Sequence, residues 1–255
     1  MHLIDSQAYG NRLRLIDPAL KAGLSGSVLL ICLIASQHLI NMIAVLWLFV
    51  LGVVWARLPV RLLIGLLAAE GSFLLVSVLG ILITVTSQAP STPSLGFGSI
   101  WLTILPESFY TASGLVSRAL ACASALNFLA LTTPIVDLID LGRRLHIPEL
   151  LLDIMTLIYR SIFSLFDSLE QMRFAQEARL GYETSQNAMR SAALIASNLL
   201  VETFRRSQRL QVALDGRCYD GTLRVLPSPR LRPWAFYGVS TLVVGSLLLC
   251  WSLLS

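Results

Sequence analysis

Charged residues are scarce in this sequence, and lysine is almost absent. Only 13% of the 255 residues are charged, and Lys21 is the one lysine among 19 basic residues. Soluble domains carry about 25% charged residues, so this composition argues against a soluble protein. With 55% hydrophobic residues and a mean hydropathy of +0.73, the chain is expected to be an integral membrane protein.

The sequence also lacks the common motifs of nucleotide-binding proteins and hydrolytic enzymes. It contains no GxxxxGK(S/T) phosphate-binding loop, no GxSxG and no HExxH. Its four cysteines form no CxxC, and its three histidines are far apart in sequence. We therefore predict a non-catalytic chain that binds no metal or other cofactor itself. Because the arginines do not form a patch on a soluble domain, a nucleic-acid partner is not expected.

Five apolar segments are expected to span a membrane, since a spanning helix needs about 20 mostly apolar residues. The polar patch Ser36-Gln37-His38 marks a tight turn between the first two. Residues 87–106 contain three prolines and two glycines and are expected to form a loop, with an interfacial turn around Trp101. The five predicted spans are residues 22–37, 39–56, 60–86, 108–132 and 234–254.

The distribution of cations predicts the topology. Cations precede the first span and lie in the turn after the second, the turn between these two spans has none, and thirteen arginines fall between residues 143 and 232. By the positive-inside rule these regions are cytoplasmic. The predicted organisation is therefore residues 1–132 with four spans and a cytoplasmic N-terminus, residues 133–232 as a cytoplasmic helical coupling domain, and residues 233–255 as a fifth span. No cleaved signal peptide is indicated.

The cytoplasmic region has helical periodicity. Long amphipathic helices are predicted at about 149–180 and 186–215, with Gly181 as a left-handed cap of the first. Glu202 and Arg206 are expected to form an i,i+4 pair on the second helix, on the face opposite Met189, Leu200 and Phe204. The predicted fold class is thus an all-α polytopic membrane protein with about five transmembrane helices and a cytoplasmic platform of long amphipathic coupling helices.

Two ionisable residues fall inside predicted spans, Glu70 in the third and Arg118 in the fourth. Their opposite charges at comparable depth suggest a pathway or switch, because intramembrane charges are expensive and often functional. The alternative is a structural ion pair, or an arginine that extends toward the interface. We favour this structural interpretation, because one chain offers little polar lining for a substrate path.

Two short stretches, EARLGY at 177–182 and DGRCYD at 215–220, resemble one another. Each has an acid two places before an arginine, uncharged residues beside the arginine, and a tyrosine soon after. Arg179 and Arg217 are both predicted at the C-terminal ends of amphipathic helices. A helix end with little bulk can enter a groove on a partner, where a guanidinium group makes bidentate bonds. Two equivalent ends suit a partner with two equivalent grooves, such as a dimeric ATPase.

The sequence resembles a known family, the CbiQ-type transmembrane T component of energy-coupling factor (ECF) transporters for cobalt. The resemblance covers nearly the whole chain. Its family-specific feature is a pair of X-Arg-X motifs, usually Ala-Arg-Gly, which in such transporters insert into grooves of two ATPase subunits. The matching stretches are RLRLIDPALK, LTTPIVDLIDLGRRLHIPELL, LIYR, MRFAQEARLGY and LDGRCYDG. The residues in the motif positions are Ala178, Arg179, Leu180, Gly216, Arg217 and Cys218.

The resemblance implies the partners and the activity. It implies two ATP-binding cassette subunits of the CbiO type that carry ATP and magnesium, and a CbiM-type membrane subunit that carries the cobalt. A small CbiN-type membrane subunit can accompany them. The protein would then be a multi-pass subunit of the bacterial inner membrane that couples ATP hydrolysis to cobalt uptake. Nickel or a vitamin is the alternative substrate. A stand-alone permease is the rival of a different class, and a lipid head-group enzyme is disfavoured.

Overall fold

The computed structural model describes residues 7–35, 37–82, 84–86, 94–97, 100–103, 106–219 and 233–254. The chain divides into two compact units. The first comprises Met1–Leu138 and Ser228–Ser255, and the second comprises Ile139–Pro227. Helix α6 (Ile135–Arg144) begins in the first unit and ends in the second. Each unit is described by itself below.

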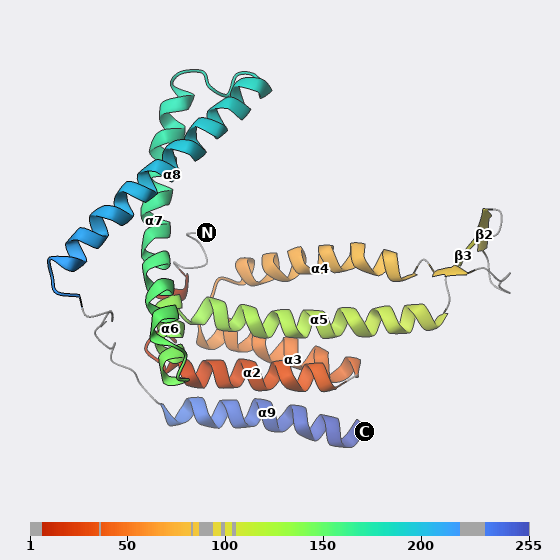
Figure 1. Cartoon of the computed structure of the whole chain (residues 1–255). Helices are drawn as coiled ribbons and strands as arrows, with labels where there is room; N and C mark the ends of the chain where they lie inside the picture. The colour runs from red at the N-terminus through yellow and green to blue at the C-terminus, as the bar shows by residue number, and fades with distance from the viewer. Residues whose placement is uncertain are drawn as a thin grey trace. The chain divides into compact units, whose positions relative to one another are not determined.

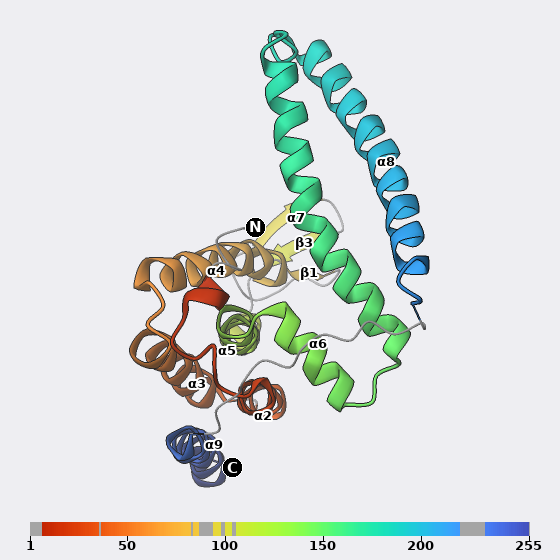
Figure 2. The same ribbon diagram turned by 90° about the vertical axis from the view of Figure 1, so that its left-hand side faces the viewer.

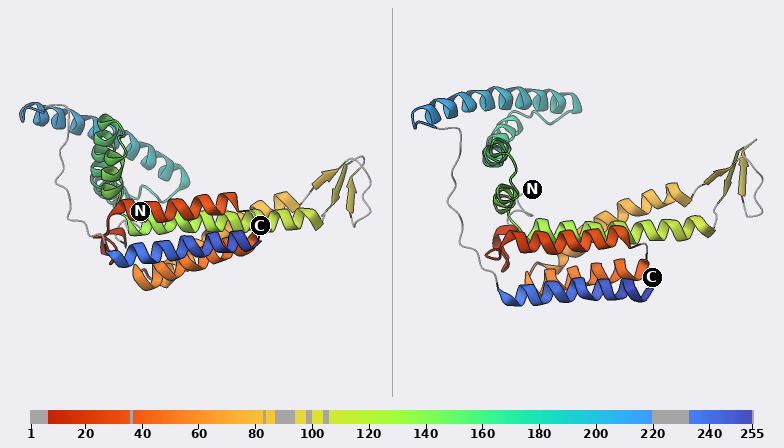
Figure 3. Two further views of the ribbon diagram at one scale, coloured as in Figure 1. Left: turned by 90° about the horizontal axis from the view of Figure 1, so that it is seen from below. Right: turned by 60° about the horizontal axis from the view of Figure 1, so that its bottom comes forward.

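The first unit is a helical bundle arranged around α5. Figure 2 shows it nearly end on, with α5 between α4 on one side and α2 and α3 on the other. Helix α9 packs along α2 and α3 (Figure 3). The apolar side chains between these helices form a single core, which includes Val28, Ile40 and Leu247. The helices are α2 (Pro18–Ile34), α3 (His38–Val50), α4 (Val60–Leu82), α5 (Pro106–Thr132) and α9 (Trp234–Leu254).

The bundle has the lengths and composition of a polytopic membrane protein. Among the described residues, four helical segments are long and apolar enough to cross a bilayer: His38–Trp55, Val60–Val78, Ala112–Thr132 and Trp234–Leu253. The first of these joins α3 to a π-helical turn, η1 (Leu51–Trp55). The predicted span 22–37 is instead the apolar helix α2, which has 17 residues and is about 26 Å long. The all-α polytopic fold class is confirmed.

The connection between α4 and α5 contains a small sheet that the sequence analysis did not predict. Helix α4 ends at Leu82, four residues before the predicted end of the third span. Strands β1 (Thr84–Thr86), β2 (Ser94–Phe97) and β3 (Ile100–Thr103) form an antiparallel sheet in the order β1-β3-β2 (Figure 1). Trp101 lies in β3 opposite Thr86 and Gly96, so the predicted turn around it is wrong. Runs such as Thr-Val-Thr favour strands because their β-branched side chains suit extended backbone.

The second unit consists of the end of α6 and a hairpin of two long helices, α7 (Glu149–Glu177) and α8 (Ser185–Asp215). The hairpin is the predicted pair of amphipathic helices. Its first helix, α7, is three residues shorter than expected. Two predicted details are wrong. The left-handed residue after α7 is Leu180. Glu202 and Arg206 do not pair with one another in the described part of the chain: Glu202 accepts a hydrogen bond from Ser168 at 2.9 Å, and Arg206 donates one to Ser164, both across the hairpin.

Candidate functional site

The two arginine motifs lie at opposite ends of α8. We call residues 178–181 the first arginine tip and residues 216–219 the second arginine tip. The first joins α7 to α8, and the second follows the last turn of α8 (Figure 1). A helix of 31 residues rises about 46 Å. The two tips are therefore too far apart to form one compact binding site.

The first arginine tip closes α7 with a left-handed residue. The Arg179 and Leu180 amides donate to the carbonyls three residues earlier, at 3.1 and 3.0 Å. Leu180 then takes a φ of 56°, which turns the backbone so that the Gly181 amide reaches the Gln176 carbonyl at 2.8 Å. This six-to-one bond, with a left-handed residue before it, is the Schellman pattern of helix ends. Arg179 is thus held directly before the reversal of the chain.

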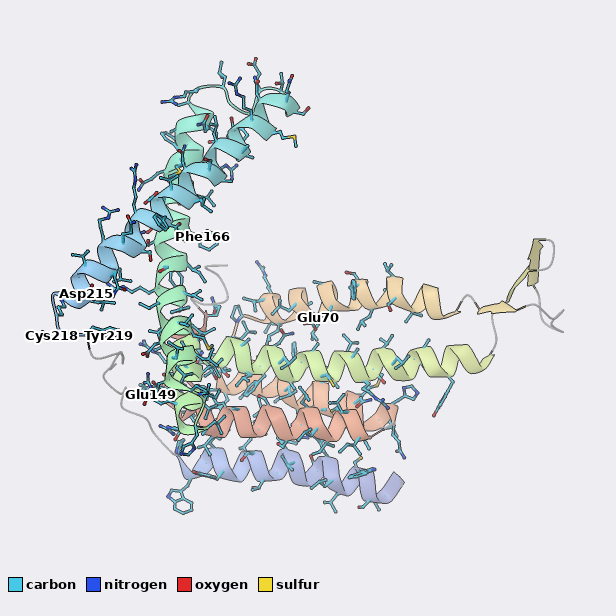
Figure 4. The ribbon with its side chains drawn as sticks, viewed as in Figure 1. Glu70, Glu149, Phe166, Asp215, Cys218 and Tyr219 are labelled. Carbon is cyan, nitrogen blue, oxygen red and sulfur yellow. The ribbon has the colours of Figure 1, made fainter. Side chains whose placement is uncertain are left out.

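The second arginine tip repeats this backbone geometry bond for bond. The Arg217 and Cys218 amides donate three residues back, at 3.0 and 3.1 Å, and the Tyr219 amide donates to the Leu214 carbonyl at 3.1 Å. Cys218 has a φ of 54°, in the same region as Leu180. Figure 4 shows Asp215, Cys218 and Tyr219 gathered at the end of α8. The likeness of the two motifs in sequence is therefore a likeness in structure.

The acid that precedes each arginine is bonded one turn back along its own helix. Glu177 accepts a hydrogen bond from the Nε of Arg173 at 3.0 Å. Asp215 accepts one from the Nε2 of Gln211, also at 3.0 Å. Arg179 and Arg217 are both exposed, and within the described part of the chain neither guanidinium group has a hydrogen bond or an ion pair. Both heads therefore remain available for acceptors on another molecule.

The same helix end also occurs after α6, where the residue before the left-handed position is not an arginine. At the end of α6, His146 has a φ of 58°, and the Ile147 amide donates to the Gly142 carbonyl at 3.1 Å. The residue before the left-handed position is Leu145 there. The backbone pattern is thus a general way for these helices to stop, and the exposed arginine distinguishes the two tips.

The first tip is additionally braced against α8. Ser191 donates its hydroxyl proton to the Gly181 carbonyl at 2.9 Å. A Cβ atom on Gly181 would lie 2.5 Å from Ser191 Oγ and 2.9 Å from the Gln176 carbonyl oxygen. Glycine is therefore required at position 181 for close packing, whereas the left-handed turn itself is made by Leu180.

Glu70 and Arg118, the intramembrane candidates, are not brought together. Glu70 faces α5 (Figure 4), where its Oε1 accepts a hydrogen bond from Asn127 Nδ2 at 2.6 Å. Arg118 lies nine residues earlier on α5, about 13 Å along the helix axis. The Oγ of its neighbour Ser117 is 3.2 Å from the Nδ1 of His38, the first residue of α3. No ion pair joins Glu70 to Arg118 among the described residues, and the prediction of comparable depth is wrong.

A search of the described residues finds no group of three or more His, Cys, Asp or Glu side chains arranged to hold a metal ion. Cys218, which belongs to the second tip, is an exposed free thiol far in sequence from the other cysteines. The strongest candidate site is consequently the pair of arginine tips, which offers hydrogen-bond donors and positive charge.

The sequence profile of the CbiQ family, described as "Cobalt transport protein", matches residues 11–228. The chain belongs to the CbiQ family of cobalt transport proteins. The matched region contains both arginine tips and the whole α7–α8 hairpin. The chain is accordingly a multi-pass membrane component of cobalt transport.

Three relatives illustrate the range of CbiQ-like sequences. The chain is 29% identical over 226 residues to the uncharacterized protein MJ1089 of Methanocaldococcus jannaschii, covering 88% of this chain and 83% of that one. It is 37% identical over 145 residues to the cobalt transport protein CbiQ of Rhodobacter capsulatus, or 57% of each chain. It is also 35% identical over 126 residues to the putative fused cobalt transport protein CbiMQ of Methanocorpusculum labreanum, which is 49% of this chain and 21% of that one.

The structure adds residues that the sequence analysis of this CbiQ-family chain missed. Lys21 is fully buried, and its Nζ donates to the carbonyls of Thr132 at 2.8 Å and Leu13 at 3.1 Å. Asn11 Nδ2 donates to the Leu131 carbonyl at 3.1 Å. We call these contacts the N-terminal clamp, because they bind the start of the chain to the last turn of α5. The sequence signal that could have identified the buried Lys21 is that it is the one lysine of the chain.

Proposed function

We propose that this chain is the energy-coupling transmembrane subunit of an ECF-type cobalt importer. In this proposal each arginine tip enters a groove on one of two ATP-binding cassette subunits, and the chain itself is not catalytic. ATP and magnesium bind the ATPase subunits, and cobalt binds a separate membrane subunit. The assembly resides in the bacterial inner membrane, with the second unit on its cytoplasmic side.

The observation that carries the proposal is the equivalence of the two tips. Both hold an exposed arginine before a left-handed residue, with the same hydrogen bonds and with the preceding acid bonded elsewhere. A guanidinium group makes short, directional bonds to carboxylates or carbonyls, which suits a mechanical contact. Two such contacts about 46 Å apart fit two copies of one partner better than one composite site.

The remaining partners follow from the family. The fused relative is named for both CbiM and CbiQ, which supports a CbiM-type membrane subunit as the partner that holds cobalt. Lipid surrounds the spans, and a small CbiN-type subunit is a possible companion in this proposal. Cobalt is favoured over nickel because the family description and the names of the CbiQ and CbiMQ relatives refer to cobalt.

The test replaces the two arginines with alanine, singly and together, in the complete transporter. We expect the double variant to lose cobalt uptake and to retain less ATPase on co-purification, while its membrane insertion is unchanged. Arg190→Ala is the matched control, since Arg190 is an exposed arginine on α8 outside both tips.

Wild-type uptake by the double variant would overturn the proposal. Cobalt uptake by this chain expressed without any ATPase would instead support the stand-alone permease. The permease hypothesis relied on a charge pair between Glu70 and Arg118. The structure does not support that pair, because Glu70 bonds to Asn127 instead. Co-purification with separate ATPase and membrane subunits is the result that we expect.

A further inference from the structure

The two arginine tips have the same backbone geometry but differ in the apolar side chains at two equivalent positions, one in each tip and one on the helix just before it. The carbonyl of Phe174 accepts from the Ala178 amide, and that of Val212 accepts from the Gly216 amide, each at 3.0 Å, so these two residues are structural equivalents. Leu180 and Cys218 are equivalents at the left-handed position. The first tip therefore has the bulkier side chain at both places.

These four side chains are largely exposed on the surface of the second unit. Phe174 is 73% exposed and Leu180 is 66% exposed, on the last turn of α7 and just after it. Val212 is 71% exposed, and Cys218 is exposed as well. Large apolar side chains gathered on an exposed surface mark contacts with another molecule. The contact at the first tip would remove more apolar surface from water than the contact at the second.

The backbone at Leu180 makes this side chain more informative. A left-handed conformation costs a non-glycine residue about 1–2 kcal/mol, and glycine takes it readily. Leucine nevertheless occupies the position, with its side chain directed mainly to solvent. A largely exposed apolar side chain at such a strained position points to use by a partner.

We propose that Leu180 is a specificity-determining residue that makes the first arginine tip the tighter of the two ATPase contacts. Leu180 packs against an apolar wall of the ATPase groove, helped by Phe174 on the last turn of α7, while Arg179 bonds to an acceptor in that groove. The second tip, with Cys218 and Val212, makes the polar contact with a smaller apolar one. This inference rests on the proposed function, because it concerns the same partner and the same two tips.

The experiment compares Leu180→Gly with Cys218→Gly in the complete transporter, reconstituted in lipid nanodiscs. Both substitutions remove a side chain from a left-handed residue, so both relieve the same backbone strain and should preserve folding. Loss of a buried leucine contact should raise the ATPase dissociation constant about tenfold for Leu180→Gly. Cys218→Gly should change it by no more than about twofold. Leu180→Met, which keeps the apolar contact, should bind within about threefold of wild type.

Equal dissociation constants for Leu180→Gly and Cys218→Gly would overturn the inference. The arginine variants separate this failure from failure of the proposed function. If Arg179→Ala and Arg217→Ala weaken ATPase binding but Leu180→Gly does not, only the role of Leu180 is wrong. If none of these variants weakens binding, the tips are not ATPase contacts, and both proposals fall.

Discussion

The two units of the chain differ in which residues they bury and which they expose. The first unit buries a lysine and an aspartate, Lys21 and Asp17, both less than 2% exposed. The second unit buries Asp153 but exposes large apolar side chains at and near the first arginine tip, such as Phe174 and Leu180. The first unit thus bonds these two buried charged groups internally, whereas the second presents apolar side chains to its surroundings.

We attribute the difference to solvent, because the first unit has the apolar spans of a membrane protein and the second is proposed to be cytoplasmic. In a bilayer no water is available to a free carbonyl, so polar groups must be satisfied within the protein. The N-terminal clamp does this at the end of α5, where the last helical carbonyls would otherwise lack donors. An aqueous surface imposes no such demand on polar groups, and there the costly feature is exposed apolar area. The second unit carries that cost at the first arginine tip, where a partner would remove it.

The largest expected effect comes from breaking the closure of the first unit. Lys21→Met removes the donor of two buried carbonyls and should lower the free energy of unfolding by about 2–5 kcal/mol. Thermal unfolding of the detergent-solubilised protein measures the change. Arg61→Met is the control, because Arg61 is exposed at the start of α4 and should shift the midpoint very little. Equal shifts for the two variants would show that the clamp contributes no special stability.

The clamp also shows where sequence reasoning stops. The spans were predictable because apolar runs and cation positions are local signals, and the residues of α3, α4, α5 and α9 match them closely. The clamp joins residues more than 100 positions apart, Lys21 to Thr132 and Asn11 to Leu131. No periodicity encodes such a contact. The same limitation explains the error over Glu70, whose partner Asn127 could only be identified once α4 and α5 were packed together.

A smaller effect should follow from disturbing the close packing of Gly181 against Ser191 and Gln176 in the first arginine tip. Gly181→Ala would place a Cβ atom 2.9 Å from the Gln176 carbonyl oxygen, a backbone atom that cannot easily move. We expect a loss of about 1–3 kcal/mol and faster amide hydrogen exchange at the end of α7. Ser191→Ala tests the brace without a clash, and it should have the smaller effect. Unchanged exchange in Gly181→Ala would mean that the turn has room that the structure does not show.

The tips themselves were predictable in part. Arg179 and Arg217 stood out in the sequence because each has uncharged residues on both sides and an acid two places before it, and both helix ends are close to the predicted positions. The handedness was assigned to the wrong residue, since glycine normally takes a positive φ and Gly181 was the obvious choice. The structure gives the left-handed position to Leu180 and Cys218, the residues that depart from the family's usual glycine.

The smallest expected effect tests how close the partner comes to the second tip. Gly216 is helical, with a φ of −66°, and a Cβ atom there would lie in ordinary contact, 3.4 Å from the Val212 carbonyl oxygen. Gly216→Ala should therefore stabilise the end of α8 by about 0.5–1 kcal/mol, measurable by amide hydrogen exchange. Ala178 already occupies the equivalent position in the first tip, so ATPase binding should be unchanged. Weaker binding in the more stable variant would show that the second groove fits only a bare backbone, and the two tips would then differ in clearance as well as in apolar surface.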